Sequence, residues 1–226
     1  MTARIASVIA LGIALGIALG AAAALAGCGG PARHVVLSAS APSDYPCVLH
    51  DPATLPHDFL VRQSLTIHAR RDGRPVDGQF DAILQKQGDT LLIVGFGPMN
   101  VKAFTLEQRG DRIEFTQFFG PELPFSPRNI VVDVHRVYFH HLPPPGPGYS
   151  GAVRGELDGE TVEETWQAGE LRRAVFTRPG SAQRGAVSVE LGPGCAPAAC
   201  EPASATLRNE WFGYTLEIAN EGYERL

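Results

Sequence analysis

Residues 78–96 read GQFDAILQKQGDTLLIVGF, and they predict two strands joined by a tight turn. Phe80, Ala82 and Leu84 alternate with other residues at the period of a half-buried strand. Residues 90–96 are apolar on both faces, so we expect a central strand there. The Gln-Gly-Asp between the two segments has the composition of a hairpin turn.

The pattern continues in both directions along the chain. Alternating segments occur at 61–70, 102–108 and 112–119, and a second strand-like series runs between residues 151 and 219. Residues 127–141 instead show helical period, and they begin with a proline in the first turn after a serine that can cap the helix. The apolar face of this helix comprises Ile130, Val131, Val134, Val137 and Tyr138. We therefore predict a mainly β fold: a single curved antiparallel sheet, or incomplete β-barrel, with one helix packed against the concave face.

The composition excludes some classes of function. The 226 residues carry 19 Lys and Arg against 24 Asp and Glu, a formal net charge of −5. The lysines are Lys86 and Lys102 alone, so the basic surface that nucleic-acid binding requires is missing. We expect no nucleic-acid partner, and the length suits one domain behind a leader.

The N-terminus predicts export and lipid anchoring. Arg4 precedes Ile5–Ala24, an uninterrupted apolar stretch that ends in Leu-Ala-Gly-Cys28. This ending resembles the lipobox of bacterial lipoproteins, which implies that Cys28 is acylated and anchors the mature chain in a membrane. Gly29 in place of aspartate then implies the outer membrane, with the protein on its periplasmic face. An uncleaved membrane-spanning helix is the alternative.

The chain therefore divides into three parts. Residues 1–27 are the predicted lipoprotein signal peptide, residues 28–60 a lipidated N-terminus and flexible tether rich in small residues and proline, and residues 61–226 the half-barrel domain. Outside the cytoplasm cysteines oxidise, and we favour a Cys195–Cys200 disulfide in a turn-rich loop. Pairing of Cys47 with either of them remains open, because three cysteines leave one over.

Metal-ligating and catalytic patterns are weak. His135, His140 and His141 gather near the helix end, but their spacing does not place them on one helix face, and no carboxylate completes the set. We interpret them as imidazoles whose charge the helix dipole stabilises at the C-terminus of the helix, and we predict no metal. Three glutamates, Glu160, Glu163 and Glu164, are interpreted as a solvated strand face. We find no catalytic constellation and expect a non-enzymatic protein without a cofactor.

An apolar surface is the remaining candidate. If the sheet curves around the helix, one side of it can hold an acyl chain away from water. The candidate lipid-binding residues are Phe80, Leu84, Phe104, Leu106 and Phe115 of the sheet, with Val131, Val134 and Tyr138 of the helix. The alternative is that the same side chains pack together as an ordinary core.

Three stretches resemble a known group of proteins. Residues 92–107, LIVGFGPMNVKAFTLE, are similar to the strand–loop–strand of LolB-like outer-membrane lipoproteins, and closer to an uncharacterised family (domain of unknown function) related to LolB. Residues 123–142 and 209–218 match that family too. The resemblance implies an incomplete barrel that cups acyl chains, with Met99 at the position of a loop residue that contacts the membrane.

The function expected from these observations is binding and handing over a lipid or acyl moiety, with no bond made or broken. A structural or interaction module that docks a periplasmic protein partner is the alternative. A third possibility is an enzyme or accessory factor that acts on acyl or polyene substrates.

Overall fold

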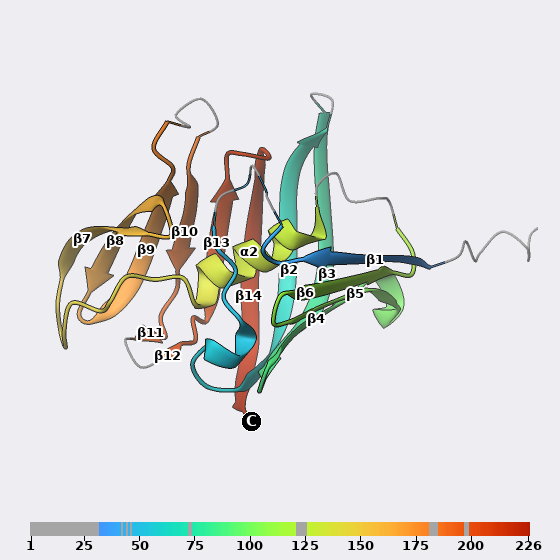
Figure 1. Cartoon of the computed structure of the whole chain (residues 1–226), viewed down its shortest axis with the longest axis horizontal. Coiled ribbons are helices and arrows are strands. Elements are labelled where there is room, and N and C mark those ends of the chain that lie inside the picture. Colours follow the sequence, from blue (N-terminus) through green and yellow to red (C-terminus); the bar gives the residue numbers. More distant parts are fainter. Residues whose placement is uncertain are drawn as a thin grey trace, which may run out of the picture. The chain divides into compact units, whose positions relative to one another are not determined.

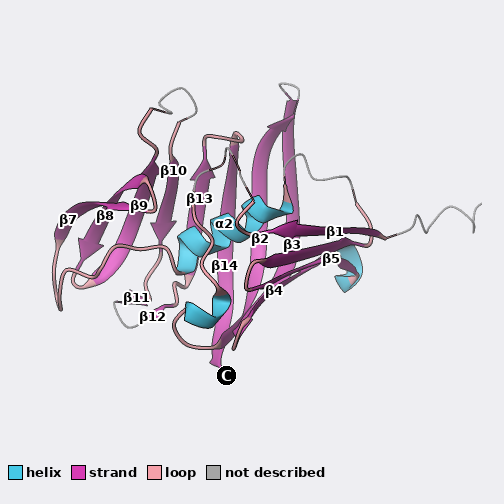
Figure 2. Ribbon diagram, viewed as in Figure 1, coloured by secondary structure: helices cyan, strands magenta, loops and turns pink. Residues whose placement is uncertain are grey.

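The computed structural model describes residues 32–41, 43, 45, 47–71, 74–120, 126–180, 185–196 and 199–226 (Figures 1 and 2). Arg33–Leu226 forms one compact unit. The predicted signal peptide and Cys28 lie outside the described residues. Among the described residues, no helix combines the length and apolarity needed to cross a membrane.

The elements of the described chain are mostly strands. The helical elements are η1 (Pro52–Thr54), η2 (Pro98–Asn100) and α2 (Pro127–Tyr138). The strands are β1 (Arg33–Ser38), β2 (Phe59–Arg71), β3 (Arg74–Gln87), β4 (Thr90–Phe96), β5 (Lys102–Arg109), β6 (Arg112–Gln117), β7 (Gly151–Leu157), β8 (Glu160–Gln167), β9 (Glu170–Thr177), β10 (Val187–Leu191), β11 (Cys195–Ala196), β12 (Ala199–Cys200), β13 (Ser204–Asn209) and β14 (Tyr214–Arg225).

Twelve of these strands form one antiparallel sheet in the order β1-β6-β5-β4-β3-β2-β14-β13-β10-β9-β8-β7. Neighbours from β2 to β6 and from β7 to β10 follow one another along the chain, so most connections are hairpins, as the turn sequences predict. The curved sheet is not closed, because β1 and β7 are its two edges. The predicted fold class, a single curved antiparallel sheet with one helix, is confirmed.

The pairing of β2 with β14 joins the two halves of the chain. Ile67 lies opposite Leu216 in a ladder that covers most of both strands, with a register shift between Asn220 and Tyr223. The alternation in β2 and β14 puts one face of each strand toward the core. This non-local pairing turns two separate meanders into one continuous sheet.

The folded unit begins earlier than the sequence indicates. Residues 33–38, which lie in the predicted tether, form β1 and pair with β6, and Val35 lies opposite Phe115. Farther along, Tyr45 and Cys47 are buried. The physical reason is that β6 would be the edge strand without β1, and β1 pairs the backbone groups that β6 would otherwise leave unpaired. The part of the expected tether from Arg33 to residue 60 therefore belongs to the domain.

Helix α2 crosses the concave side of the sheet (Figure 1). The Ser126 hydroxyl accepts a hydrogen bond from the Arg128 amide, and Pro127 occupies the first turn, as the sequence predicts. The helix ends at Tyr138, three residues before the expected end. Helical hydrogen bonding ends there because the amides of Phe139 and His140 both bond the His135 carbonyl.

A small two-stranded sheet, β11–β12, carries the disulfide between Cys195 and Cys200 that the sequence favours. The two cysteines lie directly opposite each other in this hairpin. Cys47 is a free and buried thiol. Burial raises the pKa of Cys47 to about 12, so the thiol is protonated at neutral pH.

Candidate functional site

Three phenylalanines form an aromatic group on the concave face of β3, β5 and β6. The ring centroids of Phe80 and Phe104 lie 6.4 Å apart with the rings edge to face, and those of Phe104 and Phe115 lie 5.9 Å apart. Phe115 is buried, whereas Phe80 and Phe104 are only half-buried. An apolar ligand therefore has two aromatic rings to contact at this end of the sheet.

Two glycines of the β4 segment make room for aromatic rings. A Cβ atom at Gly95 would lie 2.1 Å from the Phe104 ring, and one at Gly97 would lie 2.7 Å from the Phe119 ring. Gly95 lies in β4, and Gly97 follows the end of the strand with backbone that is still extended, so the two glycines are two positions apart on one extended segment. Phe104 and Phe119 thus lie in succession along this end of the sheet, which connects the aromatic group to the loops at the strand ends.

Those loops carry an apolar rim. We define the rim as Met99, Val101, Phe118 and Phe119, with exposed fractions of 93%, 49%, 39% and 40%. The Lys102 ammonium lies 4.5 Å from the centre of the Phe118 ring. Large apolar side chains gathered beside a cation are typical of surfaces that contact lipid or another protein.

The backbone of the rim loop is strained. Met99 has φ +59° and Asn100 has φ +56°, both in the left-handed region. For a residue such as methionine this conformation costs about 1–2 kcal/mol, and its side chain gains no packing in return because it points into solvent. Local strain without a packing benefit is characteristic of functional loops.

The eight predicted lipid-binding residues divide into two groups in the structure. Those packed in the core, each no more than 4% exposed, are Leu84, Leu106, Phe115, Val131 and Tyr138. Those half-buried against the core are Phe80, Phe104 and Val134. Only the second group has surface left for a ligand.

A surface hollow of about 230 Å³ lies elsewhere, on the convex face. It is lined by Glu107, Arg109, Arg112 and Glu114. Its charged lining does not suit an acyl chain.

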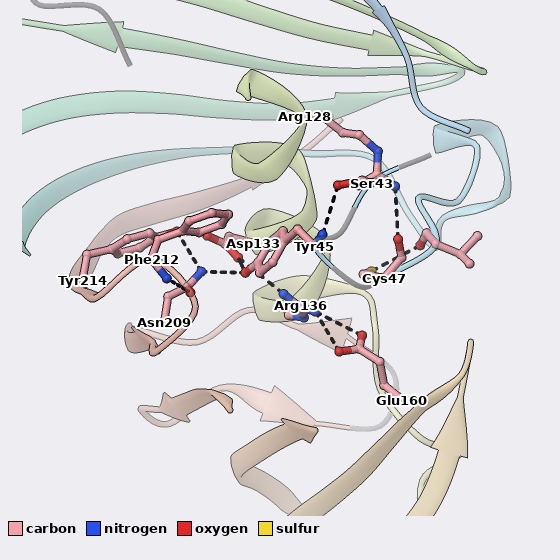
Figure 3. A network of polar contacts seen from close by, with 11 residues as sticks. Ser43, Tyr45, Cys47, Arg128, Asp133, Arg136, Glu160, Asn209, Phe212 and Tyr214 are labelled. Atoms are coloured by element: carbon pink, nitrogen blue, oxygen red, sulfur yellow. Dashed lines mark hydrogen bonds and ion pairs between the residues drawn. The ribbon is translucent and has the colours of Figure 1, made fainter. Parts of the chain in front are cut away.

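Buried polar groups fix α2 in place (Figure 3). The Asp133 carboxylate accepts hydrogen bonds from the hydroxyls of Tyr45 and Tyr214, and Asn209 donates to the Tyr45 hydroxyl at 2.6 Å. Asp133 is 6% exposed. Burial raises the pKa of this carboxyl above its ordinary value, against the opposing effect of Arg136. The helix is thereby tied to β13, to the start of β14 and to the N-terminal segment.

Arg136 makes the second set of fixed contacts. Its guanidinium donates two hydrogen bonds to the Glu160 carboxylate, at 2.8 and 3.1 Å, and both side chains are almost completely buried. The guanidinium carbon lies 4.7 Å from the centre of the Tyr45 ring and 5.3 Å from that of Phe176. A paired, stacked arginine of this kind holds α2 against β8.

The interpretation of the β8 glutamates as a solvated face is wrong for two of them. Glu160 is 1% exposed and Glu164 is 0% exposed, and only Glu163 faces solvent. Glu164 accepts hydrogen bonds from the Leu142 amide at 2.9 Å and the Trp166 indole at 3.1 Å. These partners compensate the cost of burying a carboxylate.

Two of the three helix-end histidines, His135 and His140, are buried, whereas His141 is half-buried. His135 is 0% exposed, and its Nε2 lies 3.1 Å from Oε1 of Gln108. Burial lowers the pKa of His135 to about 3 and that of His140 to about 4. Both imidazoles are therefore neutral at pH 7, so the predicted interaction of charged imidazoles with the helix dipole does not apply to them.

The fold and the site together define a class of protein. The chain is an open, antiparallel half-barrel with a helix pinned on its concave face and an apolar rim at the strand ends. It belongs to the family described as Protein of unknown function (DUF3261), whose model matches residues 60–221. No curated protein matches this chain.

Solved structures with a related arrangement have very different sequences. A LolA superfamily protein from Nitrosomonas europaea is 8% identical, with a TM-score of 0.44, covering 75% of this chain and 86% of its own. A putative outer membrane lipoprotein-sorting protein domain from Vibrio parahaemolyticus is 8% identical, with a TM-score of 0.43 and coverages of 75% and 85%. A DUF1329 family protein from Desulfovibrio piger is 13% identical, with a TM-score of 0.39 and coverages of 77% and 87%.

Proposed function

We propose that this protein is a non-catalytic carrier that binds a lipid or acyl chain at the half-buried aromatic end of its concave face. The observation that carries the proposal is the run of accessible apolar side chains from Phe80 and Phe104 to the rim residue Phe119. Acyl chains bind by removal of CH₂ groups from water, at about 0.8 kcal/mol for each. The half-buried rings of Phe80 on β3 and Phe104 on β5 provide that surface.

The same proposal includes membrane attachment. The lipobox-like ending supports acylation of Cys28 and a position on the periplasmic face of the outer membrane. In this proposal the rim contacts the bilayer or a partner protein. The ligand then passes between the concave face and that bilayer or partner. Met99, 93% exposed on a strained loop, is the residue that we assign to membrane contact.

A structural or interaction module is the second candidate function. It is favoured by the complete burial of Leu84, Leu106 and Val131, which fill the middle of the concave face without a ligand. In that case the rim would dock a periplasmic protein. The two functions differ in whether lipid binds to the purified domain.

The substitution Phe104→Asp tests the carrier function. We expect it to weaken binding of a fluorescent fatty acid to the Gly29–Leu226 segment by about 30-fold or more, because the loss of one aromatic contact corresponds to about 2 kcal/mol. Thr105→Asp, one residue along on the opposite face of β5, is the matched control and should bind as the unmodified segment does. Equal affinity of both variants would exclude lipid binding at this end.

The substitution Met99→Glu tests membrane contact. We expect the Gly29–Leu226 segment with this substitution to co-sediment with phosphatidylethanolamine and phosphatidylglycerol vesicles at least about tenfold more weakly. The reason is that a charge replaces an apolar side chain. The control is Gln87→Glu, which adds the same charge in the hairpin turn at the other end of β4. If both variants sediment alike, the rim does not enter the membrane.

A further inference from the structure

His50, His140 and Asp158 meet at one point of the domain, although they come from three distant segments. His50 precedes η1, His140 follows α2, and Asp158 lies in the turn between β7 and β8. One nitrogen from each imidazole and one carboxylate oxygen all lie within 4.8 Å of one another. This cluster lies near the C-terminal end of α2 and shares no residue with the aromatic group or the rim.

The spacing of these atoms suits a shared metal ion. His50 Nε2 lies 3.1 Å from Oδ2 of Asp158, and His140 Nδ1 lies 3.7 Å from the same oxygen. A contact of 3.7 Å is too long for a hydrogen bond. Two ligands of a tetrahedral ion with metal–ligand bonds of 2.0–2.2 Å lie about 3.3–3.6 Å apart, which falls between the two observed distances.

His140 provides an independent reason for a ligand. Its side chain is completely buried, and within the described part of the chain neither ring nitrogen has a hydrogen-bond partner. A buried polar group without a partner costs about 1–3 kcal/mol, and such groups in native proteins call for an explanation. Metal coordination satisfies one of these nitrogens.

Nearby donors have partners outside the cluster, whereas His50 Nε2 and Asp158 Oδ2 are hydrogen-bonded to each other within it. Cys47 and Glu160 also lie within 4.8 Å of a His140 nitrogen. However, Glu160 accepts two hydrogen bonds from Arg136, and the protonated Cys47 thiol donates to the Val48 carbonyl at 3.3 Å. The side chains of His50 and Asp158 are 43% and 26% exposed, which leaves the point of convergence open to solvent.

The backbone around the cluster is held in place. The Gln108 amide donates to the His50 carbonyl at 2.9 Å, and Gln108 is completely buried. Asp158 and Gly159 both have positive φ, 52° and 79°, as in a type I′ hairpin turn. Supporting contacts of this kind position ligands before the ion arrives.

We infer that His50, His140 and Asp158 form a binding site for a divalent transition metal of the Zn²⁺ type. Imidazole nitrogen and carboxylate oxygen are donors that Zn²⁺ accepts, and three protein ligands leave a coordination position for water or a group from a bound molecule. The carboxylate and two neutral imidazoles leave a net charge of +1 on the complex. An anionic headgroup is the class of ligand that such an open position recruits.

The test uses the full chain, purified in detergent with a tag that does not bind metal and stripped with a chelator. Isothermal titration with Zn²⁺ alone should show one equivalent bound per chain. The single substitutions His50→Gln, Asp158→Asn and His140→Gln should each weaken binding by about 100-fold or more, since loss of a supporting contact alone costs up to that much. Absence of stoichiometric binding to the unmodified chain would overturn the inference.

Matched controls separate this site from ordinary surface binding. His68 Nδ1 lies 2.8 Å from Asp77 Oδ1 on the β2–β3 hairpin, so His68→Gln and Asp77→Asn remove a comparable exposed pair. These two variants should retain the full affinity. Because the His50 and Asp158 side chains are partly exposed, their variants should fold, which circular dichroism checks. Unchanged Zn²⁺ affinity in the folded His50 and Asp158 variants would refute the site. Loss of affinity in the His68 and Asp77 variants would do the same.

Discussion

Replacement of Glu160 by Gln is expected to lower the free energy of unfolding by about 3–5 kcal/mol. Arg136 is completely buried, and Glu160 is the carboxylate that bonds it through two hydrogen bonds. The substitution removes the carboxylate that bonds a buried guanidinium, which also lies 3.7 Å from Asp133, and breaking a buried ion pair costs about this much. Urea denaturation of the Gly29–Leu226 segment, followed by circular dichroism, measures the difference.

The same strand provides the control for this prediction. Glu163→Gln removes the same charge from an exposed position of β8 and should change the free energy of unfolding by no more than about 0.5 kcal/mol. The double variant Arg136→Met with Glu160→Leu removes both charges and should be more stable than Glu160→Gln alone. A Glu160→Gln protein within 1 kcal/mol of the unmodified segment would show that the pair does not hold α2 in place.

Fixation of α2 affects how a ligand reaches the concave face. Asp133 and Arg136 tie the middle and the C-terminal half of the helix to groups on β8, β13 and β14. Opening the helix as a lid would break these hydrogen bonds and the ion pair, and it would expose Val131 and Tyr138, which are packed in the core. Entry along the aromatic end, past Phe104 and the rim, requires none of these contacts to break.

The periodicity of the sequence predicted the local elements because hydrophobic alternation is a property of each strand alone. Residues 90–96, apolar on both faces, form the central strand β4 as expected. The pairing of β2 with β14 joins segments more than a hundred residues apart, and alternation carries no information about which strands meet. The sequence did not predict β1 for a different reason. Its three apolar residues, Val35 to Leu37, lie in a stretch dominated by small residues and proline.

The buried charges were missed although the sequence contained a signal for two of them. Glu160 and Glu164 share a strand face with Val162 and Trp166, so the alternation itself placed them toward the core. Glutamate side chains are mostly exposed in proteins, and this general preference, which favours a solvated face, does not hold for these two. Asp133 and Arg136 were harder, because they lie on the polar side of an amphipathic helix. Tyr45 of the N-terminal segment and groups on the sheet, among them Glu160 and Tyr214, bury them together, and the helix periodicity does not reveal these contacts.

The metal cluster shows a further limit of spacing arguments. Sequence spacing does not place the histidines near the helix end on one helix face, and no carboxylate completes their set. In the structure the carboxylate, Asp158, and a second imidazole, His50, come from other segments. Ligands brought together by the fold have no fixed sequence spacing, so only the three-dimensional arrangement reveals them.

The protein is expected to lose stability as the pH falls from 6.5 toward 3, with His135 alone accounting for about 4 kcal/mol. Burial, and to a lesser extent the nearby His50, His140 and Arg128, lower the pKa of His135 in the folded state to about 3. In the unfolded chain its pKa is about 6.5. Between these values the unfolded state binds the extra proton, so the stabilisation is complete above pH 6.5 and declines by about 1.4 kcal/mol per pH unit below it.

The substitution His135→Gln isolates this contribution. The amide does not titrate, so the stability of the variant should fall less steeply with pH, and the two curves should converge or cross as the medium becomes more acidic. His34→Gln, at an exposed histidine of β1, should follow the unmodified curve. Urea denaturation at several pH values, with a chelator present to exclude metal binding, gives both slopes. Parallel curves for His135→Gln and the unmodified segment would contradict the assignment of a neutral, buried His135.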